Sequence, residues 1–136
     1  MERKQISSGT EWETKVGYSR AVQVGSEVHV SGTTATDEDG TVVGPDDPYE
    51  QTKQALRNIE TALEATDASF DDIVRTRLFV TDIEMWEAVG DAHGEVFRDI
   101  RPATSMVEVN RLIDPAMMVE IEAVAVVSDQ AASHSE

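Results

Sequence analysis

The stretch RAVQVGSEVHVSG, residues 20–32, contains two short runs in which apolar and polar residues alternate, joined at Gly25-Ser26. Such alternation is typical of a half-buried β-strand, and a two-residue connection that contains glycine is typical of a hairpin. We therefore predict two adjacent antiparallel strands with one apolar face. The valines expected on that buried face are Val22, Val24, Val28 and Val30.

An amphipathic helix is predicted after the hairpin and after a turn at 37–40 (DEDG). Asp47 precedes Pro48, and Glu50 follows shortly after, which is the pattern of an N-cap acceptor, a proline at the first helical position and a carboxylate in the first turn. Apolar residues then recur at helical spacing up to about Ala65.

A second helix is predicted from Ile83 to about Arg98, with Gly90 and Gly94 inside it. An internal glycine costs about 1 kcal/mol relative to alanine, so it is expected either to allow close packing or to leave room for another group. Of these two explanations we favour close packing. A short capped turn is predicted at 69–72, before the next strand.

The remaining β-rich segments complete one sheet. They are the short run at 41–43 and the segments 73–80, 106–109 and 118–127. Strands grouped around two helices indicate an α+β domain with a mixed β-sheet and both helices on one face. Two helices cannot cover both faces, so a face of valine, isoleucine and phenylalanine is left to be buried against another copy of the chain. We therefore predict an oligomer.

The length of 136 residues is typical of one domain with a single core. We assign that domain to residues 1–127, and we predict that the acidic tail 128–136 is disordered. No window contains the roughly 18 uninterrupted apolar residues of a membrane helix, and the first residues lack the apolar segment of a secretory signal. A soluble, cytoplasmic protein that does not bind membranes is expected.

The composition argues against several kinds of site. The chain has no cysteine and its three histidines are scattered, so disulfides and a cysteine nucleophile are excluded, and neither a metal nor another cofactor is expected. The net charge of −16 disfavours nucleic-acid binding, because affinity for phosphates comes mainly from lysine and arginine. The acidic residues are spread along the chain and lysines are few, as in halophilic proteins; an ordinary acidic mesophilic surface is the alternative.

Charged residues in two of the predicted strands are candidates for chemistry. Glu120 and Glu122 alternate with apolar residues, so both carboxylates point to one sheet face and must be paired, solvated or shifted in pKa. An ion pair at a subunit interface and a catalytic base are both open interpretations. Arg75 and Arg77 share a face of their own strand and are plausible partners for these carboxylates.

Three further features lie in or near the hairpin. Ser31-Gly32 offers a hydroxyl and a backbone that a ligand can approach closely, although a structural turn is the alternative. Tyr18 is either a ligand-binding phenol or a half-buried side chain. His29 can carry a proton near neutral pH, but we favour a packing or interface histidine.

These residues fall into a known pattern. In order from Val16 to Val127, the chain resembles the RidA/YjgF family, which is also labelled endoribonuclease L-PSP. The motifs that carry the resemblance are VGYSRAV at 16–22, VHVSG at 28–32, QT at 51–52 with QALRNI at 54–59, FVTD at 79–82, RPATS at 101–105 and VEIEA at 119–123.

The resemblance implies a chorismate-mutase-like fold and a homotrimer that forms a trimeric barrel, with one site in each cleft between subunits. Founding members of the family hydrolyse enamines and imines of 2-oxo acids, such as 2-iminobutanoate and 2-iminopropanoate, and release ammonia and the 2-oxo acid. A small-molecule ligand and further copies of the chain are therefore the implied partners. Such an assembly agrees with the uncovered sheet face.

The site that the resemblance implies is altered in this chain. In founding members an arginine of the motif Pro-Ala-Arg-Ser holds the substrate carboxylate through two parallel hydrogen bonds, and Thr104 stands at that position here. Glu120 matches the residue that positions or activates the attacking water. The other implied substrate-binding residues are Tyr18, Ser31, Gly32, Gly90, Ser105 and Met106, of which Gly90 and Met106 replace an asparagine and a common cysteine.

A missing bidentate contact is worth about 1.5 to 3 kcal/mol, so efficient deamination of 2-imino acids is not expected. Either Arg75, Arg77 or Arg101 enters the cleft instead, or the substrate lacks a carboxylate. We expect hydrolysis of another imine, enamine or related intermediate; the alternative is a non-enzymatic binding or protective protein that uses the same cleft. The ribonuclease label fits poorly with a charge of −16.

Overall fold

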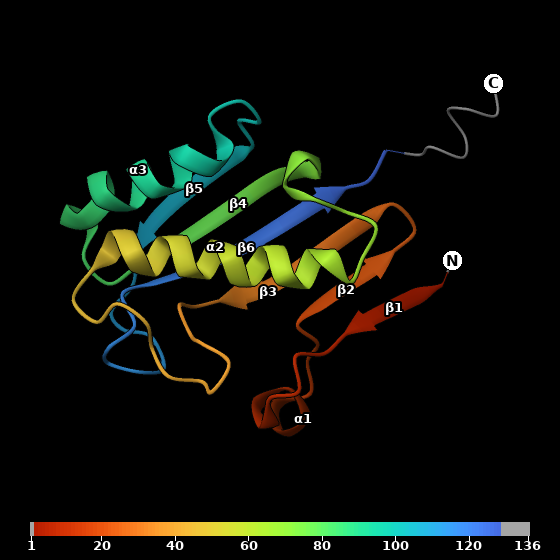
Figure 1. The fold of residues 1–136 in the computed structure, drawn as a ribbon, viewed down its shortest axis with the longest axis horizontal. Helices are drawn as coiled ribbons and strands as arrows, with labels where there is room; N and C mark the ends of the chain where they lie inside the picture. Colours follow the sequence, from red (N-terminus) through yellow and green to blue (C-terminus); the bar gives the residue numbers. More distant parts are fainter. Residues whose placement is uncertain (1, 129–136) are drawn as a thin grey trace.

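A computed structural model describes residues 2–128 and contains one six-stranded mixed sheet with two long helices against one face (Figure 1). The strands are β1 (Arg3–Ile6), β2 (Ala21–Val24), β3 (Glu27–Thr33), β4 (Ile73–Val80), β5 (Ala103–Glu108) and β6 (Val119–Val126). The helices are α1 (Glu11–Val16), α2 (Pro48–Glu64) and α3 (Trp86–Phe97), with 3₁₀ turns η1 (Phe70–Asp72) and η2 (Ile83–Met85). The sheet order is β1-β2-β3-β6-β4-β5, and only β4 and β5 pair in parallel.

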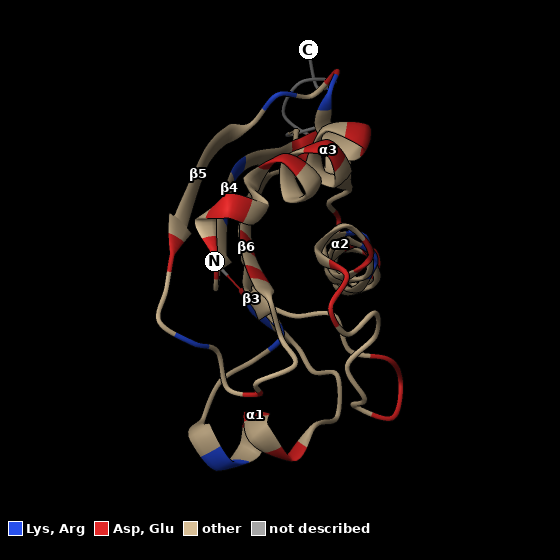
Figure 2. Cartoon of the chain, turned by 90° about the vertical axis from the view of Figure 1, so that its left-hand side faces the viewer, with Lys and Arg blue, Asp and Glu red and all other residues tan. Residues whose placement is uncertain are grey.

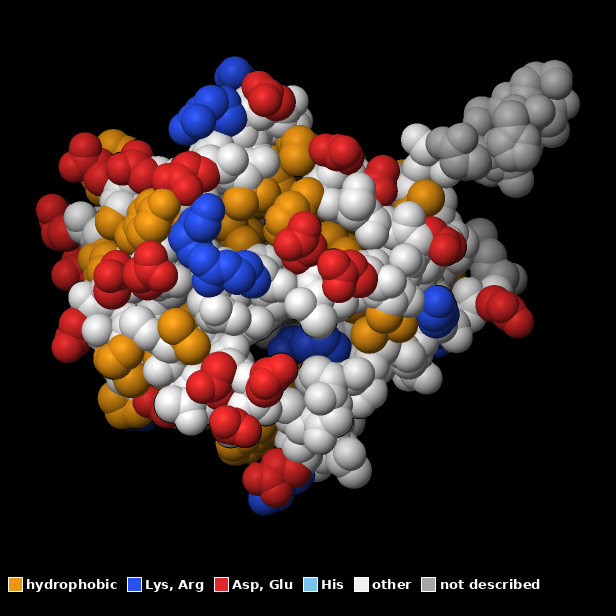
Figure 3. All heavy atoms as spheres, in the orientation of Figure 1, with side chains coloured by type: hydrophobic (Ala, Val, Ile, Leu, Met, Phe, Trp, Pro, Cys, Tyr) orange, Lys and Arg blue, Asp and Glu red, His pale blue; other side chains and the backbone are white. Residues whose placement is uncertain are grey.

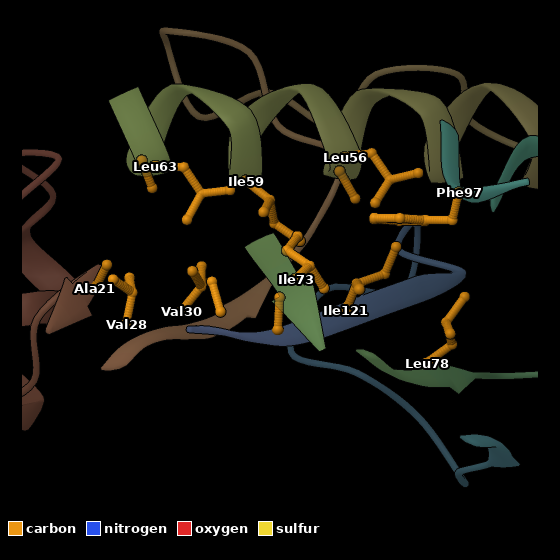
Figure 4. Packing of buried hydrophobic residues seen from close by; sticks show 14 of the residues in the cluster. Ala21, Val28, Val30, Leu56, Ile59, Leu63, Ile73, Leu78, Phe97 and Ile121 are labelled. Carbon is orange, nitrogen blue, oxygen red and sulfur yellow. The ribbon is translucent and has the colours of Figure 1, made fainter. Parts of the chain in front are cut away.

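Helix α2 begins and ends where the sequence predicts. The Asp47 carboxylate accepts a hydrogen bond of 3.0 Å from the backbone N–H of Glu50, which satisfies a donor of the first turn. Along the helix, Leu56, Ile59 and Leu63 are fully buried and face the sheet (Figure 4). Burial of side chains of this size contributes roughly 1.5 to 3 kcal/mol each, so this face holds the helix on the sheet.

The second predicted helix is divided. Its first residues form η2, and α3 proper starts at Trp86. The expectation of close packing at its glycines is wrong in this chain: a Cβ at Gly90 would meet nothing within 4 Å, and one at Gly94 would meet only the Arg98 guanidinium, at 3.6 Å. Gly90 therefore leaves open space beside α3. The capped turn at 69–72 is confirmed by a reciprocal capping box around η1.

The hairpin of β2 and β3 is confirmed, and so is the burial of Val28 and Val30, but the predicted burial of Val22 and Val24 is wrong. The two-residue turn pairs Val24 with Glu27 and Val22 with His29, so these valines lie on the face away from the helices. The core face of the hairpin carries Ala21 and Gln23 from β2 and Val28 and Val30 from β3, all buried. Directly paired residues share a face, which is why the valines of the two strands cannot all be buried together.

Several boundaries differ from the sequence prediction. β1 and α1 were not predicted. The expected strand at 41–43 is wrong, because only an isolated bridge between Thr36 and Val42 forms there. β5 begins at Ala103, before the predicted start at Met106, because it pairs in parallel with β4 along its whole length. The expectation of a disordered tail at 128–136 falls on residues that, except for Ser128, lie outside the described part of the chain.

Helices α2 and α3 lie on the same side of the sheet, and the opposite face carries no long helix (Figure 2). This open face is more polar than the sequence prediction of valine, isoleucine and phenylalanine. It presents Val22, Val24, Phe79, Val107, Val124 and Val126 together with Glu27, His29, Arg75, Arg77, Glu120 and Glu122. Arg77 pairs with Glu122 at 3.2 Å, so one of the two expected arginine–glutamate contacts is confirmed.

Acidic side chains are spread over the helix side of the molecule rather than gathered in one patch (Figure 3). The same side is hollowed between α2 and the loop at 33–40, where a groove of about 960 Å³ lies. No helix within residues 2–128 is both long and apolar enough to cross a membrane.

Candidate functional site

The predicted site residues fall into two groups, the first of which is built on an irregularity in β3. Val30 pairs with Ala123 and Thr33 with Ile121, so β3 contains one residue more than β6 between these pairs. Ser31 and Gly32 occupy this bulge. A bulge bends its strand and turns its backbone toward the neighbouring strand, and here it turns Gly32 toward Glu120 of β6.

Gly32 makes room for the Glu120 carboxylate. A Cβ at position 32 would overlap the Glu120 Oε2 atom and would also press on the other atoms of that side chain. Because three atoms of the Glu120 side chain lie within the reach of a Cβ at position 32, the two positions are sterically coupled, and any side chain at 32 would displace the carboxylate.

The environment of Glu120 favours its protonated form. Burial raises the pKa of Glu120 above the ordinary value, the neighbouring charge of Glu122 raises it further, and Arg20 acts in the opposite direction. A carboxylate with a raised pKa is a stronger base than an ordinary one, so it can take a proton from water and return it within one reaction cycle. Perturbed carboxylates of this kind are typical of functional sites.

Arg20 is a member of this group that the sequence analysis missed. Its Nη2 donates a hydrogen bond of 2.6 Å to the Gly32 carbonyl, and its guanidinium carbon lies 5.8 Å from the centre of the Tyr18 ring. Its Nε is buried without a hydrogen-bond partner within the described part of the chain. Arg20 lies inside the hairpin stretch, but local alternation gave no sign that it reaches Gly32.

Tyr18 and Ser31 complete the first group. Both line a pocket of about 560 Å³ together with residues of β1 and α1. The Ser31 hydroxyl donates a hydrogen bond of 2.7 Å to the Ser19 carbonyl, which ties the loop before β2 to the bulge. We refer to this group as the Glu120 cluster; it consists of Tyr18, Arg20, Ser31, Gly32 and Glu120.

The second group is a chain of hydrogen bonds between β4, β5 and α3. Thr76 is fully buried, and its Oγ1 lies 2.9 Å from His93 Nε2 and 2.8 Å from Thr104 Oγ1. The parallel register sets Thr76 directly beside Thr104, and the Thr104 hydroxyl reaches the Pro102 carbonyl at 3.1 Å. We refer to Thr76, His93 and Thr104 as the Thr104 network.

The surroundings of His93 favour its neutral form. Burial lowers the pKa of His93 below the ordinary histidine value, and its ring packs against Phe97 with the ring centres 4.5 Å apart. Thr76 and His93 were also missed as site residues. Thr76 falls on the core face by alternation with Leu78, but its contact with His93 joins two elements that no local pattern relates.

The other predicted residues of this side lie in α3 and on the two faces of β5. Gly90 lies one helical turn before His93 and leaves open space. Met106 packs against the core on the same face of β5 as Thr104. Ser105 points to the open face, where its hydroxyl accepts a hydrogen bond of 2.9 Å from Arg75.

The three arginines considered as replacements for the family arginine are engaged or directed elsewhere. Arg75 binds Ser105 and Arg77 binds Glu122, both on the face opposite Thr104. Arg101 is exposed before β5 and has a backbone φ of 58°. Among the described residues, Arg20 is the arginine whose positive charge lowers the pKa of Glu120.

No hydrogen bond between described residues joins the Glu120 cluster to the Thr104 network. Thr104 lies on the edge strand β5 and faces the helix side, whereas Glu120 lies on β6 and faces the open side. His29 belongs to neither group; its Nε2 lies 3.1 Å from Glu27 on the open face. Within residues 2–128 no cluster of three or more potential metal ligands occurs.

The chain is similar in sequence and in structure to known proteins. The family model described as endoribonuclease L-PSP matches residues 9–127. The crystal structure of Rv2704 from Mycobacterium tuberculosis, a member of the YjgF/YER057c/UK114 family, is 51% identical and superposes with a TM-score of 0.85 over 93% of this chain and 100% of that chain.

Two curated relatives are also similar over most of their length. An uncharacterized protein of Streptomyces coelicolor is 37% identical over 88% of this chain and 88% of its own length. The RutC family protein UK114 of Drosophila melanogaster is 34% identical over 90% of this chain and 88% of its own length.

Proposed function

This chain belongs to the endoribonuclease L-PSP family, also called RidA/YjgF, and we propose that it binds a small metabolite in a cleft between copies of the chain and hydrolyses a C=N bond there. The proposed substrate is an imine, an enamine or a related reactive intermediate. The observation that carries the proposal is the Glu120 carboxylate, which is packed on Gly32 with a raised pKa and a guanidinium nearby.

The chemistry that this arrangement supports is addition of water to the C=N carbon. Glu120 accepts a proton from water as the new C–O bond forms and passes that proton to the nitrogen, which gives a neutral carbinolamine. Glu120 then takes the proton of the carbinolamine hydroxyl and delivers it to the nitrogen, so the C–N bond breaks, the hydroxyl becomes a carbonyl and ammonia leaves. One imine and one water thus give one carbonyl compound and one ammonia.

A second copy of the chain is part of the proposal. The Glu120 cluster and the Thr104 network point away from each other within one chain, so a cleft that contains both needs another copy to supply one of them. The exposed valines of the open face, among them Val107 and Val126, favour such contacts. We propose a homotrimer with one cleft between each pair of neighbouring subunits.

Thr104 sets the expected substrate preference. A hydroxyl cannot supply the parallel hydrogen bonds and the charge that a guanidinium gives to a carboxylate. We therefore expect slow hydrolysis of 2-iminobutanoate and 2-iminopropanoate by the wild-type protein. A non-enzymatic protein that binds a ligand in the same cleft is the second candidate, because it requires the cleft but not the proton transfer.

The test is to generate 2-iminobutanoate and 2-iminopropanoate in situ and to measure their loss with the wild-type protein, Thr104→Arg and the control Thr104→Gln, which is of similar length but uncharged. Thr104 is exposed, so an arginine has room at that position. We expect Thr104→Arg to hydrolyse both imines at least about tenfold faster than wild type and Thr104→Gln not to do so.

Two other results would change the conclusion. If the wild-type protein matches a family member that carries the arginine, the interpretation of Thr104 is wrong. If neither the wild-type protein nor Thr104→Arg hydrolyses any imine, the binding protein is favoured over the enzyme.

A further inference from the structure

The Thr104 network contains a limited number of hydrogens, and their count restricts what Thr104 can offer to a ligand. Each threonine hydroxyl carries one hydrogen, and a neutral imidazole carries one on either ring nitrogen. Three contacts must be filled: His93 to Thr76 at 2.9 Å, Thr76 to Thr104 at 2.8 Å, and Thr104 to the Pro102 carbonyl at 3.1 Å.

Only one arrangement fills all three contacts. If His93 Nε2 carries the hydrogen, it donates to Thr76, Thr76 donates to Thr104, and Thr104 donates to the Pro102 carbonyl. If Nε2 is bare, Thr76 must donate to it and Thr104 must donate to Thr76, and the contact with Pro102 loses its hydrogen. In both arrangements the hydroxyl hydrogen of Thr104 is used inside the protein.

We propose that Thr104 therefore faces the cleft as a hydrogen-bond acceptor, with His93 as the positioning residue that sets this polarity through Thr76. The ligand group that complements Thr104 is then an N–H or O–H donor. The site selects a neutral ligand, such as an imine or amide with a free N–H, over a ligand that ends in a carboxylate. This inference rests on the proposed function, because it assigns a ligand class to the same cleft.

Burial fixes the inner part of this polarity. Thr76 is fully buried, so a partner that it loses is not replaced by water, and it keeps donating to Thr104 while His93 donates to it. A carboxylate, which has only acceptors, can bind the Thr104 hydroxyl only by taking its hydrogen from the exposed contact with the Pro102 carbonyl. The surroundings add to this preference, because Met106 is apolar and no side chain lies within 4 Å of the position that a Cβ at Gly90 would take.

The experiment compares three probes that share one carbon skeleton: 2-oxobutanamide, which is neutral and has N–H donors; methyl 2-oxobutanoate, which is neutral and has only acceptors; and 2-oxobutanoate, which is charged and has only acceptors. Dissociation constants come from NMR titration of the assembled wild-type protein, with the backbone amides of Thr104 and Gly32 as reporters of the site. We expect the amide to bind at least about tenfold more tightly than either other probe.

Matched variants separate the roles of Thr104 and His93. Thr104→Val keeps the shape but removes the acceptor and is expected to abolish the preference for the amide, whereas Thr104→Ser is expected to keep it. His93→Phe keeps the ring beside Phe97 but removes the donor and is expected to reduce the preference, and His93→Gln, which restores an N–H at similar reach, is expected to recover it. A change in preference, rather than in overall affinity, is the readout that a purely structural role would leave unchanged.

The outcomes are distinguishable. If 2-oxobutanoate binds at the Thr104 and Gly32 amides as tightly as the amide does, the inference is overturned while the proposed cleft stands. If no probe moves these amides, the proposed function and the inference both fail. If Thr104→Val loses the preference but His93→Phe keeps it, the role of His93 is overturned.

Discussion

The Glu120 cluster and the Thr104 network differ in how the protein holds a polar group. In the first, a carboxylate with a raised pKa occupies space that depends on Gly32 in a strand bulge, because a Cβ at that position would overlap it. In the second, neutral groups hold one another, because Thr76 contacts both His93 and Thr104, and Thr104 also donates to the Pro102 carbonyl. In the proposed function we therefore assign proton transfer to the first group and ligand recognition to the second.

The largest expected effect is at Glu120. In the Thr104→Arg background, Glu120→Gln is expected to lower the hydrolysis of 2-iminobutanoate roughly 100-fold or more, because the group that exchanges a proton with water is lost. Initial rates of 2-oxobutanoate formation measure this effect. The matched control is Glu122→Gln, which changes an exposed carboxylate of the same strand and face; a comparable loss there would show that Glu120 has no special role.

Glu120→Gln is also expected to raise the melting temperature at pH 7. The folded protein raises the pKa of Glu120, so the contribution of this residue to stability is fully present below the ordinary glutamate range and is lost as the pH rises through the folded-state value. At neutral pH the buried charge is then a cost, which glutamine removes. Thermal unfolding of both proteins between pH 4 and 8 would contradict this account if the variant were the less stable one at pH 7.

The two glycines sharpen the comparison further. Gly32→Ala forces the Glu120 carboxylate to move, and it is expected to destabilise the fold by about 1 to 3 kcal/mol and to lower turnover in the same background. Gly90→Ala fills open space inside α3 and is expected to stabilise the fold by up to about 1 kcal/mol. Denaturant unfolding of the two variants measures both effects. Equal destabilisation would mean that the space at Gly90 is occupied in the assembled protein.

A smaller effect is expected from the titration of His93. Burial lowers the pKa of His93, so its contribution to stability is present above the ordinary histidine pKa and is lost as the pH falls through the folded-state value. The wild-type protein should therefore lose a few degrees of melting temperature between pH 8 and pH 5 relative to His93→Gln. If the melting temperatures of the two proteins changed with pH in the same way, the titration of His93 would have no effect on stability, which would contradict this account.

The smallest effect is expected outside both groups. Lys53 pairs with Glu95 at 3.0 Å on the exposed surface between α2 and α3, and Lys53→Gln should cost no more than about 0.5 kcal/mol. The same denaturant unfolding measures it. A larger loss would mean that surface charge contributes more to this acidic protein than single exposed pairs usually do, and the effects assigned to the two groups would need correction for it.

Local patterns predicted the parts of the fold that depend on neighbouring residues. Asp47 and Pro48 fix the start of α2, and alternation correctly puts Glu120 and Glu122 on one face. The error at Val22 and Val24 came from counting apolar residues without the turn, since a two-residue turn pairs Val24 with Glu27 and thereby decides the face.

The candidate site was less predictable because it depends on contacts between distant segments. The bulge that brings Gly32 to Glu120 appears only when β3 pairs with β6. The contact between Thr76 and Thr104 requires the parallel register of two strands that are separated by α3, and neither hydroxyl is notable in its own segment. The family resemblance predicted Thr104 as a site residue, but it did not predict that Thr76 and His93 are joined to its hydroxyl by hydrogen bonds.

The central claim is that the Glu120 cluster of one copy and the Thr104 network of another form one cleft, and the absence of cysteine from the chain allows a direct test. Tyr18 precedes β2 and Thr104 lies on β5, which are four strand spacings apart, or about 19 Å at the usual separation of strands. Tyr18→Cys/Thr104→Cys should therefore be joined by a short bis-maleimide only between copies. The account predicts covalent dimers and trimers on a denaturing gel, with neither single-cysteine variant giving trimers; a double variant that remains monomeric would contradict it.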